Sequence, residues 1–303
     1  MSALPAVTTV ICTHNRPQLV RVAIDAAMDQ RYDGDLEVIV VFDRTEPDRT
    51  LERESPGRRV RVIANDRTGG LAGARNAGAA RATGDVIAFC DDDDAWLPGK
   101  IAAQVSRFDD PDVGVVTSAI LVAFGDRIIP RVPELDEITH ADLLADRVFA
   151  AHPSTVVVRR SVWDELGGID EAIPGSYGED YDWILRAAKV TRIAVVPTPL
   201  VRVLWGATSM FNDRWQMQVD AFEYLLAKHR EFESVPGGKA RILGQLAFAR
   251  AGAGDHRGAR RAATQAFRLN PKEKRAYLSM LAGCHVVGSV RILRTLNRFG
   301  RGF

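Results

Sequence analysis

Residues 7–28 read VTTVICTHNRPQLVRVAIDAAM, and this stretch contains the first unit of the predicted fold. Residues 7–11 form a short run of Val, Ile and Thr, which is typical of a buried strand. A helical pattern begins at Pro17 and continues to about Met28. Proline is tolerated in a first turn because the N–H there has no partner within the helix. The stretch therefore predicts a strand, a polar connection and a helix in succession.

The same alternation continues through the first third of the chain. Residues 36–41, 60–64 and 86–89 are apolar and rich in β-branched side chains, and each run predicts a strand. Residues 70–82 are rich in alanine, which favours helix, and a second helical pattern covers residues 99–108. This order predicts an α/β fold: a mostly parallel, doubly wound sheet with helices on both faces.

The middle of the chain is less regular. Residues 113–117, 119–124 and 154–158 predict strands, and a helix is expected to begin at Ser161. The side chain of Ser161 is expected to form a capping box with Asp164. Two further elements are predicted here, a helix over residues 179–189 and a strand over residues 192–196.

From residue 212 onward the pattern is helical. Helices are predicted over residues 215–229, 240–251 and 257–269. Residues 247–271 carry small side chains where two helices would touch, a weak likeness to a tetratricopeptide unit. One such unit cannot bury its own apolar face. We therefore expect residues 212–303 to form an accessory helical lobe.

Composition excludes several classes of protein. The formal net charge is +1, so no global basic field argues for nucleic acid as a partner. Cys12, Cys90 and Cys284 are too scattered for a disulfide framework and fit a reducing cytoplasm. The N-terminus lacks the pattern of a secretion signal, and no apolar run approaches the ~20 residues of a membrane-spanning helix. A folded cytoplasmic protein is expected.

Polar residues follow three of the predicted strands directly. These segments are Thr13-His14-Asn15-Arg16, Asp43-Arg44-Thr45 and Asp91-Asp92-Asp93-Asp94. Ligands of an open parallel sheet bind beyond the carboxyl ends of its strands, so the three segments should meet along one edge. The first two offer hydrogen-bond partners for a base and a ribose, and the third offers oxygen ligands.

The four consecutive aspartates are the strongest single feature. Carboxylates crowded at the end of a buried strand repel one another unless a cation is present. Mg²⁺ and Mn²⁺ prefer oxygen ligands, and Mg²⁺ is commonly held by one or two carboxylates and substrate phosphates. A bound ion would bridge a diphosphate and neutralise its charge as it leaves. The alternative is a solvated acidic turn that caps the next helix, but the position directly after a strand favours a metal site.

The glycine-rich residues 69–78 contain Arg75 and are less specific. They match neither a P-loop nor a dinucleotide-binding fingerprint. Glycines allow a backbone to approach phosphate at a helix N-terminus, but a tightly packed Ala/Gly helix explains these glycines better. Arg75 could reach a base, a sugar or a phosphate.

A second acidic cluster, Glu179-Asp180-Tyr181-Asp182, opens a predicted helix. Acids in a first turn ordinarily compensate the helix dipole. Here a stretch typical of a surface loop, residues 174–177, leads into the cluster, as expected of a loop over a pocket. An acceptor hydroxyl needs a base to take its proton, so this cluster is the candidate catalytic base.

Six segments, in agreeing order and spacing, resemble the family 2 glycosyltransferases, which are inverting enzymes with the nucleotide-diphosphosugar transferase (GT-A) fold. They are residues 10–16, 37–43, 74–78, 89–98, 166–171 and 178–186. The resemblance implies a metal-dependent enzyme that moves a sugar from a nucleoside diphosphate donor, a UDP-sugar, to an acceptor hydroxyl. Its product would belong to a glycan or glycoconjugate.

The resemblance also implies a donor site formed by residues 1–115. Asp43 would accept a hydrogen bond from the edge of a pyrimidine, and Asp92 would lie near the ribose. The residues expected to bind the nucleotide sugar are Thr13, His14, Asn15, Arg16, Asp43, Arg75, Asp91 and Asp92.

The metal ligands and the base follow from the same resemblance. Asp91 and Asp93 frame a DxD-type motif, in which Asp93 would be the best ligand for Mn²⁺ or Mg²⁺. Asp180 matches the general base, with Glu179 as the alternate. Residues 116–211 would form the acceptor-binding half of the same domain, for a saccharide, a lipid-linked or a small-molecule acceptor.

The sequence departs from the family pattern in two places. The second-strand motif usually carries two acids followed by Gly-Ser, whereas only Asp43 is present here. An Arg-x-x-His pattern often follows late in the domain, but here Arg202 is followed by Trp205 in the histidine position. That places a histidine metal ligand in doubt. His152 is either an acceptor contact or an ordinary structural residue.

Two other functions stay open at this point. A sugar nucleotidyltransferase uses a related sheet, but such enzymes usually carry a glycine-rich loop after the first strand, where this chain has no glycine. A non-catalytic nucleotide-sugar-binding module is the second alternative. Both acidic clusters are intact, which argues against a module that has lost catalysis.

The C-terminal tail combines arginines with apolar residues. Arg291, Arg294, Arg298 and Arg301 are separated by Ile, Leu and Phe side chains. Such a segment can lie on an anionic membrane or a partner. The favoured interpretation is a helix that packs on the helical lobe with a solvated basic face. On the first interpretation the protein would work at the inner face of the membrane, on a lipid-linked or cell-surface glycan.

Overall fold

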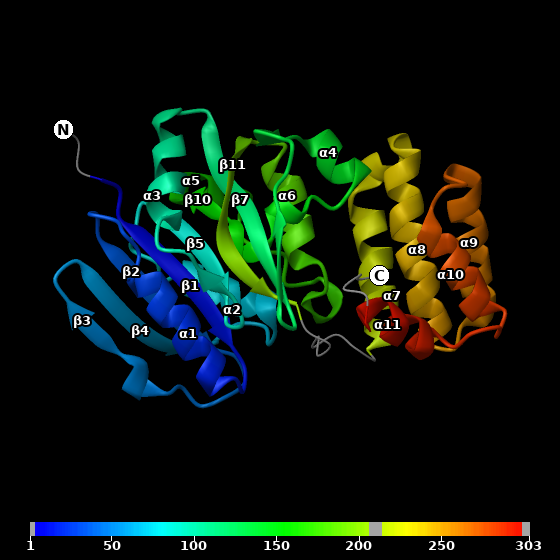
Figure 1. Cartoon of the computed structure of the whole chain (residues 1–303), viewed down its shortest axis with the longest axis horizontal. Helices are drawn as coiled ribbons and strands as arrows, with labels where there is room; N and C mark the ends of the chain where they lie inside the picture. Colours follow the sequence, from blue (N-terminus) through cyan, green and yellow to red (C-terminus); the bar gives the residue numbers. More distant parts are fainter. Residues whose placement is uncertain (1–3, 206–213, 299–303) are drawn as a thin grey trace. The chain divides into compact units, whose positions relative to one another are not determined.

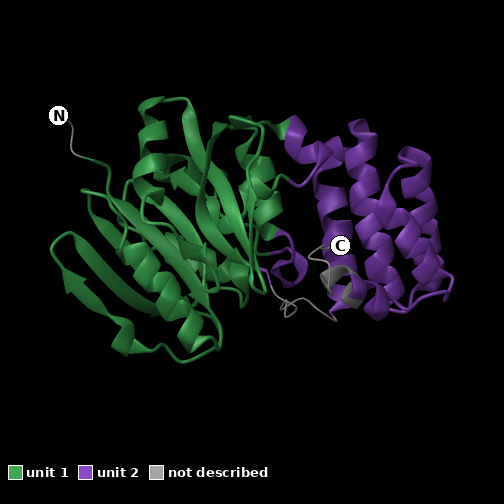
Figure 2. Cartoon of the chain, in the orientation of Figure 1, with its two compact units in different colours: residues 1–140, 148–171, 179–204 green, residues 141–147, 172–178, 205–303 purple. Residues whose placement is uncertain are grey.

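The computed structural model describes residues 4–205 and 214–298. The chain divides into two compact units, coloured separately in Figure 2. Unit 1 comprises residues 1–140, 148–171 and 179–204, and unit 2 comprises residues 141–147, 172–178 and 205–303. Unit 1 contains the sheet and unit 2 is helical.

Unit 1 is built on one mixed sheet (Figure 1). Its strand order is β3-β4-β2-β1-β5-β10-β7-β11-β6, with β8 paired to β7 and β9 paired to β11. The strands are β1 (Val7–Thr13), β2 (Leu36–Phe42), β3 (Arg53–Ser55), β4 (Arg58–Ala64), β5 (Val86–Asp91), β6 (Ala95–Trp96), β7 (Val113–Phe124), β8 (Arg127–Arg131), β9 (Glu137–Ile138), β10 (Val157–Arg159) and β11 (Arg192–Leu204). The core strands β4, β2, β1 and β5 are parallel, as are β7 and β11.

Helices cover both faces of this sheet, which confirms the predicted fold class. The helices of unit 1 are α1 (Pro17–Met28), α2 (Leu71–Ala79), α3 (Lys100–Val105), α5 (Arg160–Leu166) and α6 (Glu179–Ala187). Ile11 of β1 shares one apolar core with Ile24 of α1 and Ile101 of α3. Val10 points to the opposite face, because successive side chains of a strand alternate.

On the face of the sheet to which Val10 points, α2 packs closely against β1. A Cβ at Gly78 of this helix would lie 2.4 Å from Val10 Cγ1, so only glycine fits without displacing the side chain of Val10. On the same face, the ring of Trp163 in α5 lies 5.0 Å from that of Phe89 in β5. The glycines of residues 69–78 therefore include one that serves packing.

The strand order reverses next to β1. The chain runs outward from β1 to β2 and β4, and then returns to the other side of β1 as β5. Cys12 is the register partner of Asp91, so the carboxyl ends of β1 and β5 are adjacent. Open α/β sheets bind ligands at such a topological switch point. The segments that follow Thr13 and Asp91 meet there.

Several predicted elements were wrong in detail. β7 is one strand over residues 113–124, where two were predicted. β11 continues to Leu204 through two prolines, which are accommodated by irregular register with β7. The predicted capping box at Ser161 does not form: α5 begins at Arg160, so Ser161 lies inside the first turn, and no side chain caps the helix. The short strands β3, β6, β8 and β9 were not predicted.

Unit 2 is an alanine-rich helical region. Its helices include α7 (Trp215–Lys228), α8 (Pro236–Gly252), α9 (His256–Leu269), α10 (Lys274–Gly283) and α11 (Ser289–Arg298), while α4 (His140–Ala145) enters it from unit 1. Ala247 of α8 packs against Ala262 and Ala263 of α9, so the helices approach closely. Asp255 caps α9 by accepting a hydrogen bond from the Gly258 backbone N–H.

A helix with the length and hydropathy needed to span a bilayer is not found among residues 4–205 and 214–298.

Candidate active site

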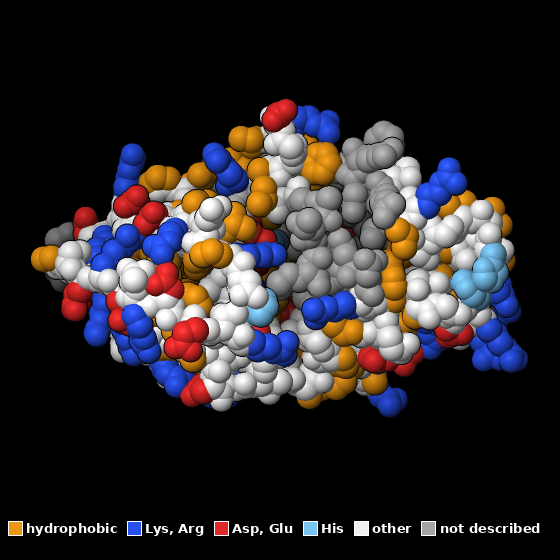
Figure 3. Space-filling model, turned by 90° about the horizontal axis from the view of Figure 1, so that it is seen from below, with side chains coloured by type: hydrophobic (Ala, Val, Ile, Leu, Met, Phe, Trp, Pro, Cys, Tyr) orange, Lys and Arg blue, Asp and Glu red, His pale blue; other side chains and the backbone are white. Residues whose placement is uncertain are grey.

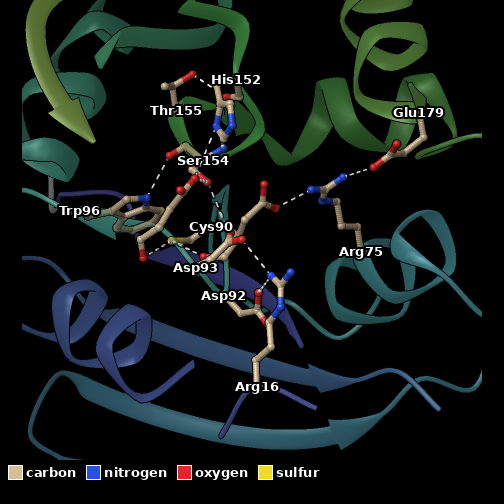
Figure 4. Close-up of polar contacts among 12 residues, drawn as sticks. Arg16, Arg75, Cys90, Asp92, Asp93, Trp96, His152, Ser154, Thr155 and Glu179 are labelled. Carbon is tan, nitrogen blue, oxygen red and sulfur yellow. Dashed lines mark hydrogen bonds and ion pairs between the residues drawn. The ribbon is translucent and has the colours of Figure 1, made fainter. Parts of the chain in front are cut away.

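The turn after β5 and the loop after β1 meet through hydrogen bonds, and Figure 4 shows those that Arg16 donates to the aspartates. Thr13 Oγ1 donates to Asp92 Oδ2 at 2.7 Å. Arg16 Nη1 donates to Asp92 Oδ1 at 2.9 Å and to Asp93 Oδ2 at 2.8 Å. Four residues predicted to bind donor or metal therefore form one cluster at the switch point.

A second cation holds the other side of the turn. Arg75 of α2 is almost fully buried, and its Nη2 donates to Asp91 Oδ1 at 2.6 Å. Its Nη1 pairs with the carboxylate of Glu179, the first residue of α6. Arg75 thus connects the predicted donor site to the predicted catalytic segment, which lies about a hundred residues later in the sequence.

Asp94 has a different environment from its three neighbours. It is buried, and both of its carboxylate oxygens accept hydrogen bonds, from Ser154 Oγ at 2.5 Å and from the Leu204 backbone N–H at 3.2 Å. Ser154 Oγ also accepts from the Asp91 backbone N–H, and Trp96 Nε1 donates to the Ser154 backbone oxygen. Ser154 therefore fixes the aspartate turn from the segment that precedes β10, a role that sequence reasoning missed.

The donor set at this turn fits a divalent cation. Asp91, Asp94 and His152 each offer a ligand atom, and these atoms lie within 4.8 Å of one another. His152 Nδ1 lies 3.6 Å from Asp94 Oδ2. Carboxylate oxygens with one imidazole suit Mn²⁺, and carboxylates alone suit Mg²⁺. Asp93, the predicted ligand, keeps a partly exposed side chain and lies beside Arg16.

Burial dominates the electrostatics of the turn. It raises the pKa values of Asp92, Asp93 and Asp94, and the carboxylate of Asp91 raises them further. The guanidinium of Arg16 opposes this shift at Asp92 and Asp93. A bound cation would offset this crowded negative charge, so the electrostatics of the turn are compatible with a metal ion.

Asp43, the residue expected at the nucleobase, lies at the end of β2. Its Oδ1 accepts hydrogen bonds from Asn65 Nδ2 at 2.8 Å and from the Gly70 backbone N–H at 3.1 Å. The ring of His14 reaches the Asp43 backbone oxygen at 2.7 Å, and Asn15 Nδ2 lies 3.2 Å from His14 Nε2. The predicted residues His14, Asn15 and Asp43 are therefore brought together, at a distinct part of the same sheet edge.

The two candidate bases differ in accessibility. Glu179 is 3% exposed and ion-paired with Arg75, and burial raises its pKa to about 7 although Arg75 opposes the shift. Asp180 is only partly buried, and its charge raises the pKa of Glu179. An acceptor can approach a partly exposed carboxylate but not one enclosed with a guanidinium. The exposure of the two carboxylates therefore favours Asp180 over Glu179 as the predicted catalytic base.

The segment before α6 is locked onto α2 by Asn76. Its side chain donates to the Ile169 backbone oxygen at 2.8 Å and accepts from the Ile169 N–H at 2.9 Å. It also donates to Glu171 Oε1 at 2.8 Å. These bonds hold residues 166–171 against residues 74–78, so one predicted motif positions the other.

A lysine lies in the apolar layer beside this site. Lys100 of α3 is fully buried, and its Nζ lies 3.9 Å from the ring centre of Trp96. The Nζ has no hydrogen-bond partner among the described residues. Burial lowers the pKa of Lys100 to about 7. Sequence reasoning missed this group because its position in an amphipathic helix is ordinary for a surface lysine.

Replacing Arg75 by methionine is expected to lower the free energy of unfolding by about 3–5 kcal/mol, since Glu179 and Asp91 would lose their buried counter-charge. The loss should be larger at pH 8 than at pH 5. The pKa of Glu179 is already raised in the folded state, so the protonated form is tolerated at low pH and the cost grows as the pH rises. Urea denaturation without donor measures both effects.

Arg81→Met provides the matched control for this prediction. Arg81 follows α2 and pairs with Asp66 at 2.6 Å, but both side chains are substantially exposed. An exposed pair of this kind contributes within about 1 kcal/mol. Equal losses of unfolding free energy in the two variants would show that the buried ion pairs of Arg75 contribute no more to stability than the exposed pair of Arg81.

Comparison with known proteins adds an independent line of support. The model of glycosyl transferase family 2 matches residues 8–167. Among curated proteins, the chain is similar to the uncharacterized glycosyltransferase YwdF of Bacillus subtilis, with 33% identity over 197 residues, 63% of this chain and 71% of the relative.

Two solved structures share the fold. The S. aureus TarS fragment 1-349, in complex with UDP-GlcNAc, has a TM-score of 0.63 and 15% identity, covering 97% of this chain and 92% of that one. Mannosyltransferase PcManGT from Pyrobaculum calidifontis, in complex with GDP-Man and Mn²⁺, has a TM-score of 0.58 and 18% identity, covering 97% and 84%. At these identities the structural likeness shows the fold alone.

Proposed function

The chain belongs to glycosyl transferase family 2, and from this premise we propose that it transfers a sugar from a nucleoside diphosphate donor to an acceptor hydroxyl, with inversion at the anomeric carbon. One observation carries the proposal. The carboxylates of Asp91, Asp92 and Asp93 gather with Arg16 and Arg75 at the switch point between β1 and β5. In this arrangement the arginines would attract the negative diphosphate, and the carboxylates would bind the divalent ion that accompanies it.

The donor is proposed to be a UDP-sugar. Asp43 Oδ1 is occupied by Asn65 and the Gly70 N–H, while Oδ2 lies 3.9 Å from Arg44 Nε. In this proposal Oδ2 accepts the ring N–H of a uracil. The TarS fragment was crystallised with UDP-GlcNAc, which is consistent with a uridine donor.

The cofactor is proposed to be Mn²⁺ or Mg²⁺, held by Asp91 and Asp93. Asp94 is a poorer ligand because both of its oxygens already accept hydrogen bonds, so its role is to position the turn. PcManGT was crystallised with Mn²⁺, which is consistent with such a site. When bound, the ion neutralises charge on the departing diphosphate.

The chemical step is proposed as a single displacement. Asp180 takes the proton of the acceptor hydroxyl, and the hydroxyl oxygen forms a bond to the anomeric carbon from the face opposite the diphosphate. The bond from that carbon to the diphosphate oxygen breaks, and the electron pair leaves with the nucleoside diphosphate. Arg75, fixed between Asp91 and Glu179, contributes positive potential at the donor side.

The acceptor is proposed to be a saccharide, a lipid-linked glycan or a small molecule, used at the cytoplasmic side of the membrane. Peripheral membrane contact through the C-terminal tail forms part of this proposal. The side chains of Arg294 and Arg298, and the whole of Arg301, lie outside the described residues.

The function is tested with a panel of nucleotide sugars, with and without Mn²⁺. We expect a UDP-sugar to raise the thermal unfolding midpoint in the presence of Mn²⁺, because a ligand that binds only the folded state stabilises it. Slow turnover should then release UDP. Release of pyrophosphate would indicate a nucleotidyltransferase, and binding without consumption would indicate a non-catalytic module.

A further inference from the structure

The charge of the chain is distributed very unevenly. Residues 236–303 contain fourteen Lys and Arg residues but only two Asp and Glu residues, a formal charge of +12. Residues 1–235 contain twenty-six basic and thirty-seven acidic residues, a formal charge of −11. The whole-chain value of +1 conceals this division. The C-terminal helices therefore carry a strong positive field of their own.

Part of this charge is exposed and unneutralised on α9. Arg257, Arg261 and Arg268 follow one another along the outer face of the helix, opposite its buried alanines. None of the three forms an ion pair with any other residue in the described part of the chain. By contrast, Arg250 in the preceding helix α8 pairs with Glu223.

Apolar side chains are exposed on the neighbouring helix α10. Tyr277 is 52% exposed and Leu281 is 41% exposed. The ring of Tyr277 contacts that of Phe267 in α9 edge-on, with centres 4.4 Å apart, and Arg260 of α9 donates to the Gly283 backbone oxygen. These contacts place the two exposed stripes side by side. Figure 3 shows basic and hydrophobic side chains exposed together over the helical unit, at the right of the view.

The apolar exposure continues beyond α10. Val286 is 66% exposed in the turn after the helix, and Val290 is 43% exposed at the start of α11. We define the basic face as six residues of α9 and α10: Arg257, Arg261, Arg268, Lys274, Tyr277 and Leu281. Lys274 is exposed and lies one helical turn before Tyr277.

We propose that the basic face docks on the surface of an anionic lipid bilayer. Arginine and lysine side chains would contact the anionic headgroups, while Tyr277 and Leu281 would enter the boundary between headgroups and acyl chains. Duplex nucleic acid offers phosphates, but its bases are already stacked on one another and it has no apolar layer for the exposed leucine. A lipid surface satisfies the charges and the apolar side chains together. This inference does not depend on the proposed sugar transfer, but it extends the proposed membrane contact from the C-terminal tail to α9 and α10.

The experiment is flotation of the full chain with lipid vesicles. One set of vesicles contains phosphatidylcholine with about 30% phosphatidylglycerol. The other set contains phosphatidylcholine alone. We expect binding to the anionic vesicles only, and weaker binding as the salt concentration rises, because salt screens surface charge.

Charge reversal tests the residues. Arg257→Glu, Arg261→Glu and Arg268→Glu combined should lower the partition coefficient at least about 100-fold at low salt. The matched control reverses three exposed arginines of unit 1, Arg31, Arg59 and Arg107, and should change it less than about 3-fold. Circular dichroism verifies that both triple variants remain folded.

A second variant separates docking from simple charge attraction. Tyr277→Gln with Leu281→Gln retains every charge, and we expect it to bind about 10-fold more weakly with unchanged salt dependence. The proposal is overturned by equal binding to neutral and anionic vesicles, by equal losses in the two charge-reversal variants, or by full binding of the double glutamine variant. Tighter binding to duplex DNA than to anionic vesicles would likewise overturn it.

Discussion

Replacing Asp180 by asparagine is expected to leave donor affinity within about 3-fold of the wild type and to lower the rate of transfer by about 100- to 10,000-fold. Asparagine has the same shape but cannot take a proton at neutral pH. Its effect should therefore appear in kcat, because the lost interaction exists only as the hydroxyl gives up its proton. Calorimetry with a UDP-sugar and a UDP-release assay measure the two quantities separately.

Glu179→Gln is the control for this assignment. Glu179 is enclosed with Arg75, so its amide variant should weaken the buried ion pair and lower the stability of the fold. If Glu179 were the base instead, its variant would lose transfer while Asp180→Asn kept it. Wild-type transfer by Asp180→Asn would remove Asp180 from the mechanism.

Replacing Asp93 by alanine is expected to weaken Mn²⁺ binding and the metal-dependent part of donor binding by at least about 100-fold. The side chain of Asp93 is partly exposed at the turn, whereas that of Asp94 is buried and bonded to Ser154. Calorimetric titration with Mn²⁺ alone, and then with UDP and Mn²⁺, gives the affinity without requiring turnover.

His152→Ala distinguishes the two ligand sets available at the turn. The ligand atoms of Asp91, Asp94 and His152 lie close together. If the ion binds Asp91 and Asp93, the alanine variant of His152 should keep its Mn²⁺ affinity within about 3-fold. A large loss of Mn²⁺ affinity in His152→Ala, with little loss in Asp93→Ala, would indicate that the ion binds Asp91, Asp94 and His152 instead.

The sheet and its edge were predictable because their signals are local. Apolar runs mark strands wherever they occur, and the rule that ligands bind at the carboxyl ends of parallel strands does not require knowledge of the strand order. The structure places Thr13, Arg16, Asp92 and Asp93 in one cluster as that rule requires. Their roles in binding and catalysis stay predictions.

The features that could not be predicted from the sequence depend on contacts between residues far apart in the chain. β10 is three residues long and lies antiparallel between β5 and β7, a position that no local pattern indicates. The bond from Ser154 to Asp94 joins residues sixty positions apart. Likewise, the whole-chain charge could not reveal the basic C-terminal region, because a sum contains no information on position.

The buried amine of Lys100 has a practical consequence for anyone who purifies this enzyme. Its pKa falls from 10.5 to about 7 on folding, so its contribution to stability is complete above pH 10.5 and is lost as the pH falls through about 7. At low pH the amine of Lys100 would have to carry its charge in the apolar surroundings beside Trp96. Mildly alkaline storage should therefore prolong the shelf life of the protein, and acid elution steps should shorten it.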